Sequence, residues 1–153
     1  MNEVQGKAVA LITGSGRPRI GRRIAQALGE RGYRIAMHYN NSGSQAREVL
    51  VEFRDRGIDA EAYQADVSQE ADIDRMFDSL QDRFGRLDVL VTTASVWQPK
   101  KLEETTADDL RFNFDINTLG TFLCVRRGGL IMAEQESGGV VVTIGDWAIE
   151  RPY

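Results

Sequence analysis

The sequence has 153 residues, a length typical of one domain that buries roughly two-thirds of the surface of its unfolded chain. Its 19 Lys and Arg against 23 Asp and Glu give a net charge of −4, so no broad basic field predicts binding to nucleic acid or to an anionic membrane. Cys124 is the single cysteine, which excludes an intrachain disulfide, and the N-terminus resembles neither a signal peptide nor a membrane span. We therefore expect a cytoplasmic protein.

Short apolar runs alternate with stretches of helical period along the chain. Strands are expected at residues 8–13, 34–39, 59–66, 87–94 and 140–144. The helices expected between them begin near Ile20, around Ala46, after Ser68 as N-cap, and near Asp108. Parallel strands need crossover connections, and those crossovers cover both faces of a sheet. The pattern thus predicts an α/β fold with a doubly wound parallel sheet of five strands.

The residues after the first strand, TGSGRPRIG, form a glycine-rich turn that leads into a helix. Gly14, Gly16 and Gly21 permit a tight turn and leave room for a pyrophosphate beside backbone N–H groups. The spacing departs from G-x-G-x-x-G, because the third glycine comes two positions late. An ordinary strand-to-helix loop is the alternative interpretation.

The end of the second strand, HYNNSGS, carries no acid that would hold the ribose diol of NAD. Asn40, Asn41 and Ser42 can instead bind a 2′-phosphate, for which Arg17 supplies positive charge. The alternative is that these are turn residues only. We expect NADP(H) as the cofactor, because the missing acid removes a repulsion in either case.

Further motifs follow the later strands in a recognisable order. They are Ala-Asp ending at Asp66, TTAS at residues 92–95, and Asn117 within FDINTLG. Together with the glycine-rich turn, they resemble the N-terminal part of a short-chain dehydrogenase/reductase over essentially the whole chain. The resemblance implies one NADP-binding Rossmann domain over residues 1–153, with Asn117 shaping the helix that carries a proton-relay water. The expected cofactor-binding residues are Gly14, Gly16, Arg17, Arg19, Ile20, Gly21, Tyr39, Asn40, Asn41, Ser42, Asp66, Val67, Thr93, Ala94 and Ser95.

Three departures from the family pattern indicate a particular group within that family. Arg19 replaces a glycine of the first turn, TTAS replaces an N-N-A-G motif whose asparagines brace the turn, and Asp146 stands where the fifth strand normally ends in a catalytic serine. With Trp97, and with the closing DWAIERP, these features are similar to pteridine reductases and dihydromonapterin reductases. That similarity implies a dihydropterin substrate.

The same similarity gives three residues a role at the substrate. Trp97 would stack on the pterin ring, and Arg19 would reach a cofactor phosphate or a pterin oxygen. Asp146 would help supply the proton that follows hydride transfer to a ring C=N. The alternatives are a surface aromatic, an exposed arginine, and a turn or capping aspartate.

One pair that the family uses is missing from this sequence, because no tyrosine is followed by a lysine at the fourth position. In the pattern that the chain resembles, Tyr-x-x-x-Lys would lie beyond residue 153, so we expect these residues to be part of a longer enzyme. A sheet ending at the fifth strand would expose VVVTI as an apolar edge.

Three functions remain open on the sequence. The first is NADPH-dependent reduction of a pteridine; the others are reduction of a 3-oxoacyl, sugar or steroid ketone, and dinucleotide binding without catalysis. We also expect a homodimer or homotetramer. The helix near Asp108 is apolar on more than one side, so it is either deeply buried or also meets another subunit, as the equivalent helix does in oligomeric members of the family that the chain resembles. His38 and Cys124 are interpreted as structural, and no metal-ligand spacing is found in the sequence.

Overall fold

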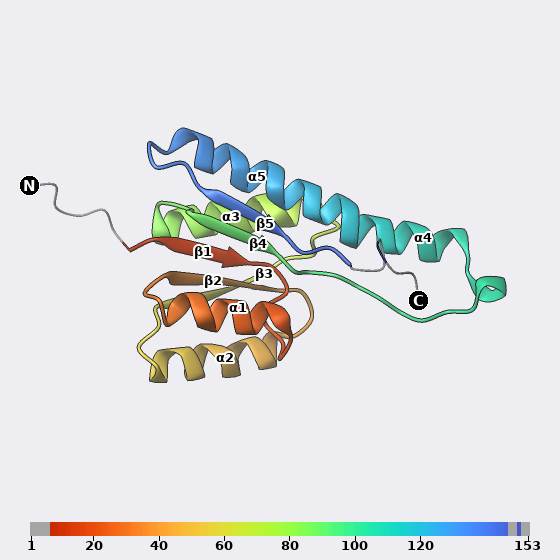
Figure 1. Ribbon diagram of the computed structural model, residues 1–153, viewed down its shortest axis with the longest axis horizontal. Coiled ribbons are helices and arrows are strands. Elements are labelled where there is room, and N and C mark those ends of the chain that lie inside the picture. Colours follow the sequence, from red (N-terminus) through yellow and green to blue (C-terminus); the bar gives the residue numbers. More distant parts are fainter. Residues whose placement is uncertain (1–6, 147–149, 151–153) are drawn as a thin grey trace, which may run out of the picture.

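A computed structural model describes residues 7–146 and Glu150 (Figure 1). Five parallel strands form one sheet in the order β3-β2-β1-β4-β5. They are β1 (Val9–Ile12), β2 (Arg34–Tyr39), β3 (Ala60–Gln64), β4 (Val89–Thr92) and β5 (Val140–Thr143). The predicted fold class is confirmed, and every predicted strand is present, although four of them are shorter than their apolar runs.

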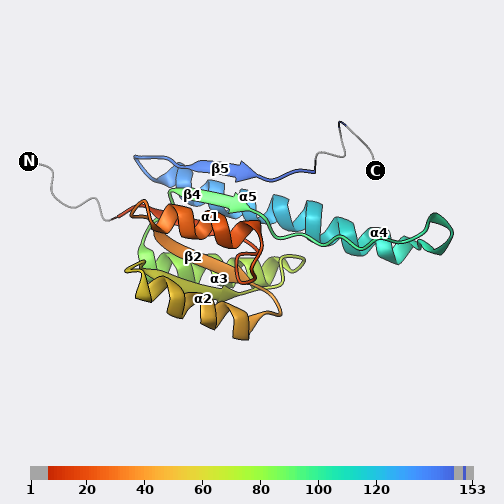
Figure 2. The ribbon, with the colours of Figure 1, turned by 60° about the horizontal axis from the view of Figure 1, so that its bottom comes forward.

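Helices cover both faces of this sheet, as Figures 1 and 2 show. One face is covered by α1 (Ile20–Gly29) and α2 (Gly43–Asp55), and the other by α3 (Glu70–Phe84) and α5 (Gly120–Glu134). Neighbouring residues of a strand serve opposite faces, because side chains alternate along a strand. Ile12 packs with Phe53 of α2 in one core cluster, whereas Leu11 packs with Phe77 of α3 in the other.

The long helix expected from about Asp108 is divided into three segments. These are α4 (Ala107–Asn113), a π-helical segment η2 (Phe114–Leu119) and α5, preceded by a short 3-10 turn η1 (Leu102–Glu104). Thr106 caps α4, since its hydroxyl accepts the Asp109 N–H at 3.3 Å while the Asp109 carboxylate accepts the Thr106 N–H at 2.8 Å. The helical periodicity predicted the length of this region but not the π-helical interruption.

The prediction that Ser68 is the N-cap of α3 is wrong. Gln69 occupies the N-cap position without a side-chain hydrogen bond. Ser68 instead donates its N–H and its hydroxyl to Asp66 Oδ1, at 2.9 and 2.7 Å. Asp72, in the first turn of α3, accepts the Asp66 N–H at 3.0 Å. These bonds fix the chain after β3 in place of the expected cap.

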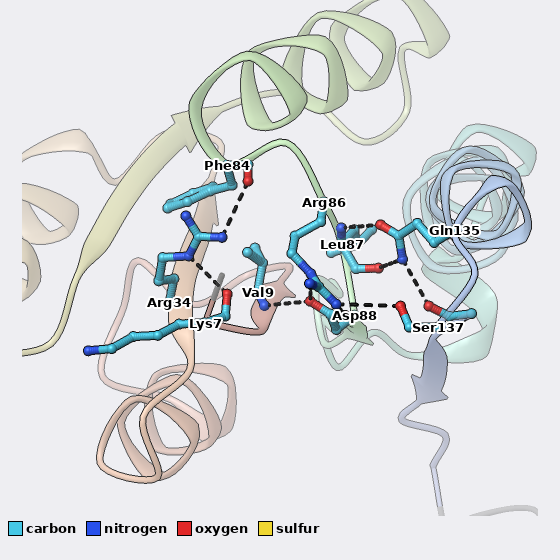
Figure 3. Close-up of polar contacts among 10 residues, drawn as sticks. Lys7, Val9, Arg34, Phe84, Arg86, Leu87, Asp88, Gln135 and Ser137 are labelled. Carbon is cyan, nitrogen blue, oxygen red and sulfur yellow. Dashed lines mark hydrogen bonds and ion pairs between the residues drawn. The ribbon is translucent and has the colours of Figure 1, made fainter. Parts of the chain in front are cut away.

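Polar contacts tie the amino ends of the central strands together (Figure 3). Asp88 accepts the Val9 N–H at 2.8 Å and pairs with Arg86, which joins the start of β1 to the start of β4. Gln135, after α5, accepts the Leu87 N–H and donates to the Leu87 carbonyl, each at 2.8 Å. This end of the sheet is therefore held by side chains, while the opposite, carboxyl end remains available for a site.

The β5 strand lies at an edge of the sheet and pairs with β4 alone among the described strands. Val140, Val142 and Ile144 keep 58, 41 and 48 % of their surface exposed. The predicted apolar edge is thus confirmed. In the described part of the chain, no helix has both the length and the apolar content needed to cross a lipid bilayer.

Candidate functional site

A cavity of about 360 Å³ lies at the carboxyl ends of β1, β2, β3 and β4. Its volume falls in the range of small-molecule and cofactor pockets. Strand order reverses between β1 and β4, which is where open parallel sheets bind ligands. The lining residues are Gly14, Gly16, Arg17, Arg19, His38, Tyr39, Asn40, Asn41, Ser42, Asp66, Val67, Ser68, Thr93, Ala94, Ser95, Val96, Phe112, Asp115 and Ile116.

Most of the residues predicted to bind the cofactor line this one cavity. The exceptions are Ile20 and Gly21. Ile20 begins α1 and is 59 % exposed, and Gly21 is buried, where an added Cβ would meet the Thr93 hydroxyl. Gly21 therefore allows α1 to approach the turn after β4 and does not itself border the cavity in the described structure.

The glycines of the first turn are needed because the chain approaches itself closely. Gly14 has φ +69°, and a Cβ there would lie 2.9 Å from Ala94 Cα. A Cβ on Gly16 would lie 2.7 Å from Tyr39 Cβ. The sequence suggested room for a pyrophosphate as the reason for these glycines. Close packing of the turn against neighbouring strands is a second reason.

The amino end of α1 borders the cavity through Arg19. Arg19 is the N-cap residue and makes no side-chain capping bond, and the first turn of α1 contains no acid. The helix dipole therefore adds positive potential beside Arg17 and Arg19, both of which line the cavity. This end of the cavity suits an anionic group.

His38 braces the glycine-rich turn from β2. Its Nδ1 accepts the Gly14 N–H at 3.0 Å, and its Nε2 lies 3.0 Å from the Ala65 carbonyl oxygen. The ring is 2 % exposed, and this burial lowers the pKa of His38 below 6.5 against the opposing effects of the Ala65 carbonyl and the Asp66 charge. The expectation of a structural histidine is confirmed, but His38 also lines the cavity.

Threonine hydroxyls hold the turn after β4. Thr13 Oγ1 accepts the N–H groups of Thr93 and Ala94, each at 3.0 Å, and the Thr93 hydroxyl donates to the Thr13 carbonyl. The asparagines that brace this turn in the family pattern are absent, and Thr13 and Thr93 hold it instead. A buried hydroxyl at the end of β1 supplies the acceptor for both backbone groups.

The mouth of the cavity near β2 brings neutral polar groups and a cation together. Asn40, Asn41 and Ser42 follow β2 there, and Arg17 of the glycine-rich turn lines the same cavity. Among the acids that line the cavity, Asp66 is nearest in sequence to these residues. Its carboxylate accepts hydrogen bonds from Ser68, after β3. The lining therefore offers hydrogen-bond donors and one guanidinium to a phosphate at this point.

Asn117, predicted as catalytic, lies in η2 and holds the loop after β4. Its Oδ1 accepts the Val96 N–H and its Nδ2 donates to the Val96 carbonyl, both at 2.9 Å. Val96 lines the cavity, so Asn117 positions its wall. The asparagine side chain thus connects the π-helical segment to the site, consistent with the frequent occurrence of such segments at functional positions.

Of the three residues predicted to meet the substrate, Arg19 lines the cavity, whereas Trp97 and Asp146 lie outside the described lining. Trp97 follows the lining residues Ser95 and Val96 and is 71 % exposed. Asp146 is exposed and lies beyond the end of β5. Most of the closing DWAIERP segment falls outside the described residues, and among those described no group of metal-ligating side chains is found.

Sequence reasoning missed part of the cavity wall. The missed residues are His38, Ser68, Val96, Phe112, Asp115 and Ile116. The last three share one helical face, at spacing i, i+3, i+4, and this spacing was the available signal. Their position beside β3 and β4 depends on how η2 packs, which periodicity does not reveal.

Comparison with known proteins places the chain among characterised relatives. The model of the short chain dehydrogenase family matches residues 8–151. The chain is 35 % identical over 135 residues to the 3-oxoacyl-[acyl-carrier-protein] reductase FabG of Staphylococcus aureus, covering 86 % of this chain and 53 % of that protein. It is 35 % identical over 142 residues to the tetrahydroxynaphthalene reductase of Pyricularia oryzae, covering 93 % and 48 %.

Solved structures agree with these relatives. A dehydrogenase/reductase from Sinorhizobium meliloti superposes with a TM-score of 0.89 at 31 % identity, over 95 % of this chain and 57 % of that one. An alcohol dehydrogenase from Thermococcus sibiricus, in complex with 5-hydroxy-NADP, gives a TM-score of 0.82 at 27 % identity, over 90 % and 57 %. The chain spans about half the length of the curated relatives that it matches. It belongs to the short-chain dehydrogenase family.

Proposed function

We propose that this chain provides the dinucleotide site of an NADP(H)-dependent reductase. The observation that carries the proposal is the cavity at the carboxyl ends of four parallel strands, lined by the glycine-rich turn and by a β2 end without a carboxylate. Its volume and its mixture of backbone, amide and guanidinium groups suit a nicotinamide dinucleotide.

Each part of the cofactor has a matching part of the lining. Gly16 and the amino end of α1 would hold the pyrophosphate, and Arg17 with Asn40 and Ser42 would hold the 2′-phosphate. Asp66 and Val67 would border the adenine, while Ala94 and Ser95 would lie toward the nicotinamide. When bound, NADPH supplies hydride, and the chain's own residues orient the ring and exclude water.

Selectivity for the 2′-phosphate tests the cofactor assignment. Replacing Arg17 by Ala removes a charge-assisted contact, so we expect the Kd for NADPH to rise about tenfold with little change for NADH. Arg23→Ala is the matched control, because Arg23 is exposed on α1 and does not line the described cavity. Fluorescence titration measures both constants, and equal affinities for NADPH and NADH in the unaltered protein would contradict the preference for NADP.

For the substrate we propose a dihydropterin. Its support is the sequence similarity carried by Arg19, Trp97 and Asp146. A carboxylate suits a ring that presents N–H groups, and hydride transfer to C=N leaves a nitrogen that must gain a proton. NADPH oxidation by the full-length protein in the presence of a dihydropterin tests this, and Asp146→Ser is expected to abolish it.

A carbonyl substrate is the second candidate. It is favoured by relatives whose names describe reduction of 3-oxoacyl-[acyl-carrier-protein] and of tetrahydroxynaphthalene. NADPH oxidation with a 3-oxoacyl thioester and not with a dihydropterin would select it. Saturable NADPH binding without turnover of either substrate would instead indicate a binding module, the third possibility.

We further propose a cytoplasmic homo-oligomer, dimer or tetramer, assembled through the helical region that follows the site. Its support is a set of exposed apolar side chains on α4, η2 and α5, which are Leu110, Phe114, Phe122 and Leu130. Such faces occur where subunits meet. Sedimentation of the protein and of a Phe122→Glu variant would test this, and an unchanged mass for the variant would count against an interface at Phe122.

A further inference from the structure

His38 bridges three neighbouring segments at the carboxyl end of the sheet. It lies near the end of β2, its side chain bonds Gly14 after β1 and Ala65 after β3, and its carbonyl accepts the Ser15 N–H at 3.0 Å. Two consecutive N–H groups of the glycine-rich turn are therefore accepted by one residue. A phosphate at this turn must then meet N–H groups from Gly16 onward, because those of Gly14 and Ser15 are already bonded.

We propose that His38 is a positioning residue of the dinucleotide site, which holds the glycine-rich turn open for the cofactor only while its imidazole is neutral. This inference rests on the proposed function. The side chain also faces the cavity that the turn borders. Loss of its bond to Gly14 would release the first residue of the turn, whose φ of +69° and contact with Ala94 depend on being held in place.

The direction of the two bonds requires one particular tautomer. A carbonyl only accepts, so Nε2 must carry the hydrogen that reaches Ala65, and Nδ1 must be bare to accept from Gly14. A protonated ring would place an N–H donor at Nδ1 against the Gly14 N–H donor. Protonation therefore replaces an attraction with a repulsion at the first residue of the turn.

Several groups set the charge around this ring. Asp66 after β3 acts on the ring by its charge, and Tyr63 is its register partner on β3. Asp72 of α3 is bonded to the Asp66 N–H, and Arg17 and Arg19 of the turn line the same cavity as His38. Burial favours the neutral ring and is the largest influence on the pKa of His38, whereas Asp66 favours the charged ring. The balance keeps the ring neutral at pH 7 and allows it to protonate in acid.

Asparagine and glutamine substitutions separate the two bonds of the ring. An asparagine in place of His38 would present its amide oxygen near the position of Nδ1, and a glutamine would present its amide nitrogen near that of Nε2. We therefore expect His38→Asn to retain the Gly14 contact and to bind NADH within about threefold of the unaltered protein. His38→Gln and His38→Leu leave the Gly14 N–H without an acceptor, and we expect the Kd to rise about tenfold.

The pH profile of binding distinguishes positioning from general support of the fold. The measurement uses NADH by fluorescence titration from pH 5 to 8, because the 2′-phosphate of NADPH itself titrates near pH 6. Affinity of the unaltered protein is expected to fall as the pH drops below the pKa of His38, whereas His38→Asn should lack that dependence. Equal profiles for the two proteins at a pH where NMR shows that the imidazole has become protonated, or an unchanged Kd in His38→Leu, would overturn the inference.

A measurement on the unaltered protein avoids variants that fail to fold. The ¹⁵N NMR shifts of the imidazole report which nitrogen carries hydrogen, and we expect a bare Nδ1 at pH 7 and a Gly14 amide shift that changes in step with ring protonation. A hydrogen on Nδ1 at pH 7 would overturn the inference while leaving the cofactor proposal intact. Absence of saturable NADH and NADPH binding would overturn both.

Discussion

At the scale of single residues, Thr13 decides how the turn after β4 is held. Its buried hydroxyl accepts two N–H groups, those of Thr93 and Ala94. Thr13→Val keeps the shape of the side chain but leaves both groups without an acceptor, each costing about 1–3 kcal/mol. We expect urea denaturation to show a loss of about 2–6 kcal/mol in the free energy of unfolding.

Thr13→Ser is the matched control for that substitution. Serine keeps the hydroxyl and loses one methyl group, so the expected loss is only about 1 kcal/mol. If the valine and serine variants unfold at the same urea concentration, the two hydrogen bonds do not stabilise the turn as the geometry indicates.

The sequence identified this turn but not its braces. TTAS was recognisable as a departure from the family pattern, in which the usual bracing asparagines are missing. The replacement acceptor, Thr13, is separated from Thr93 by 80 positions. The pairing of β1 with β4 brings them together, so no local sequence pattern predicts the contact. His38 was missed as a brace for the same reason, since Gly14 and Ala65 reach it across two strand pairings.

At the scale of elements, Asn117 anchors η2 to the loop after β4. Asn117→Ala removes both bonds to Val96, at a cost of about 1–3 kcal/mol, and frees a wall of the cavity. We expect a lower midpoint of urea denaturation together with weaker NADPH binding. The combination follows because Val96 and Ile116, on either side of the contact, both line the cavity.

Asn113→Ala provides the comparison for this element. Asn113 makes one bond, to the Asp109 carbonyl within α4, and alanine favours the helix. We expect a change within about 0.5 kcal/mol and unaltered NADPH binding. A loss of NADPH affinity equal to that of Asn117→Ala would show that the contact with Val96 has no particular role.

Strands and helices were predictable where the signal is local. The alternation of apolar runs with helical stripes located all five strands and the start of α1 at Ile20. The end of a helix depends on finer competition, as Ser68 shows by bonding Asp66 in place of capping α3. The π-helical turn was equally inaccessible, because one extra residue in a turn hardly changes the apolar pattern of the long segment.

At the scale of the whole molecule, parallel strand order explains why a cavity could be predicted at all. Parallel strands bring their following turns to one edge, so residues as distant as Gly14, Asn40 and Ala94 meet there. Beyond β5, strand pairing no longer predicts where the side chains lie. The Ile144 N–H makes a bond to Thr92 at 3.3 Å, and Asp146 lies past it, where no strand pairing described here fixes the chain. Its role at a substrate therefore rests on similarity alone.

Protonation of the whole molecule provides a final prediction, because two buried or partly buried groups have pKa values below their ordinary ones. His38 is held below 6.5 by burial, so the unfolded chain binds its proton first as the pH falls. Partial burial disfavours ionised Asp88, but the Arg86 hydrogen bond, the Val9 N–H and the charges of Arg86 and Arg34 outweigh it and hold its pKa below 3.8. Acid therefore favours unfolding through both groups.

The two contributions should appear at different pH. Stability measured by urea denaturation is expected to decline first below pH 6.5 through His38, and again below about pH 4 through Asp88 and other paired carboxylates. His38→Asn should remove the first decline and retain the second, whereas Asp88→Asn should lower stability at neutral pH and flatten the second alone. His38 is the one histidine of this sequence. If stability still declines below pH 6.5 in His38→Asn, the decline comes from a group other than a histidine.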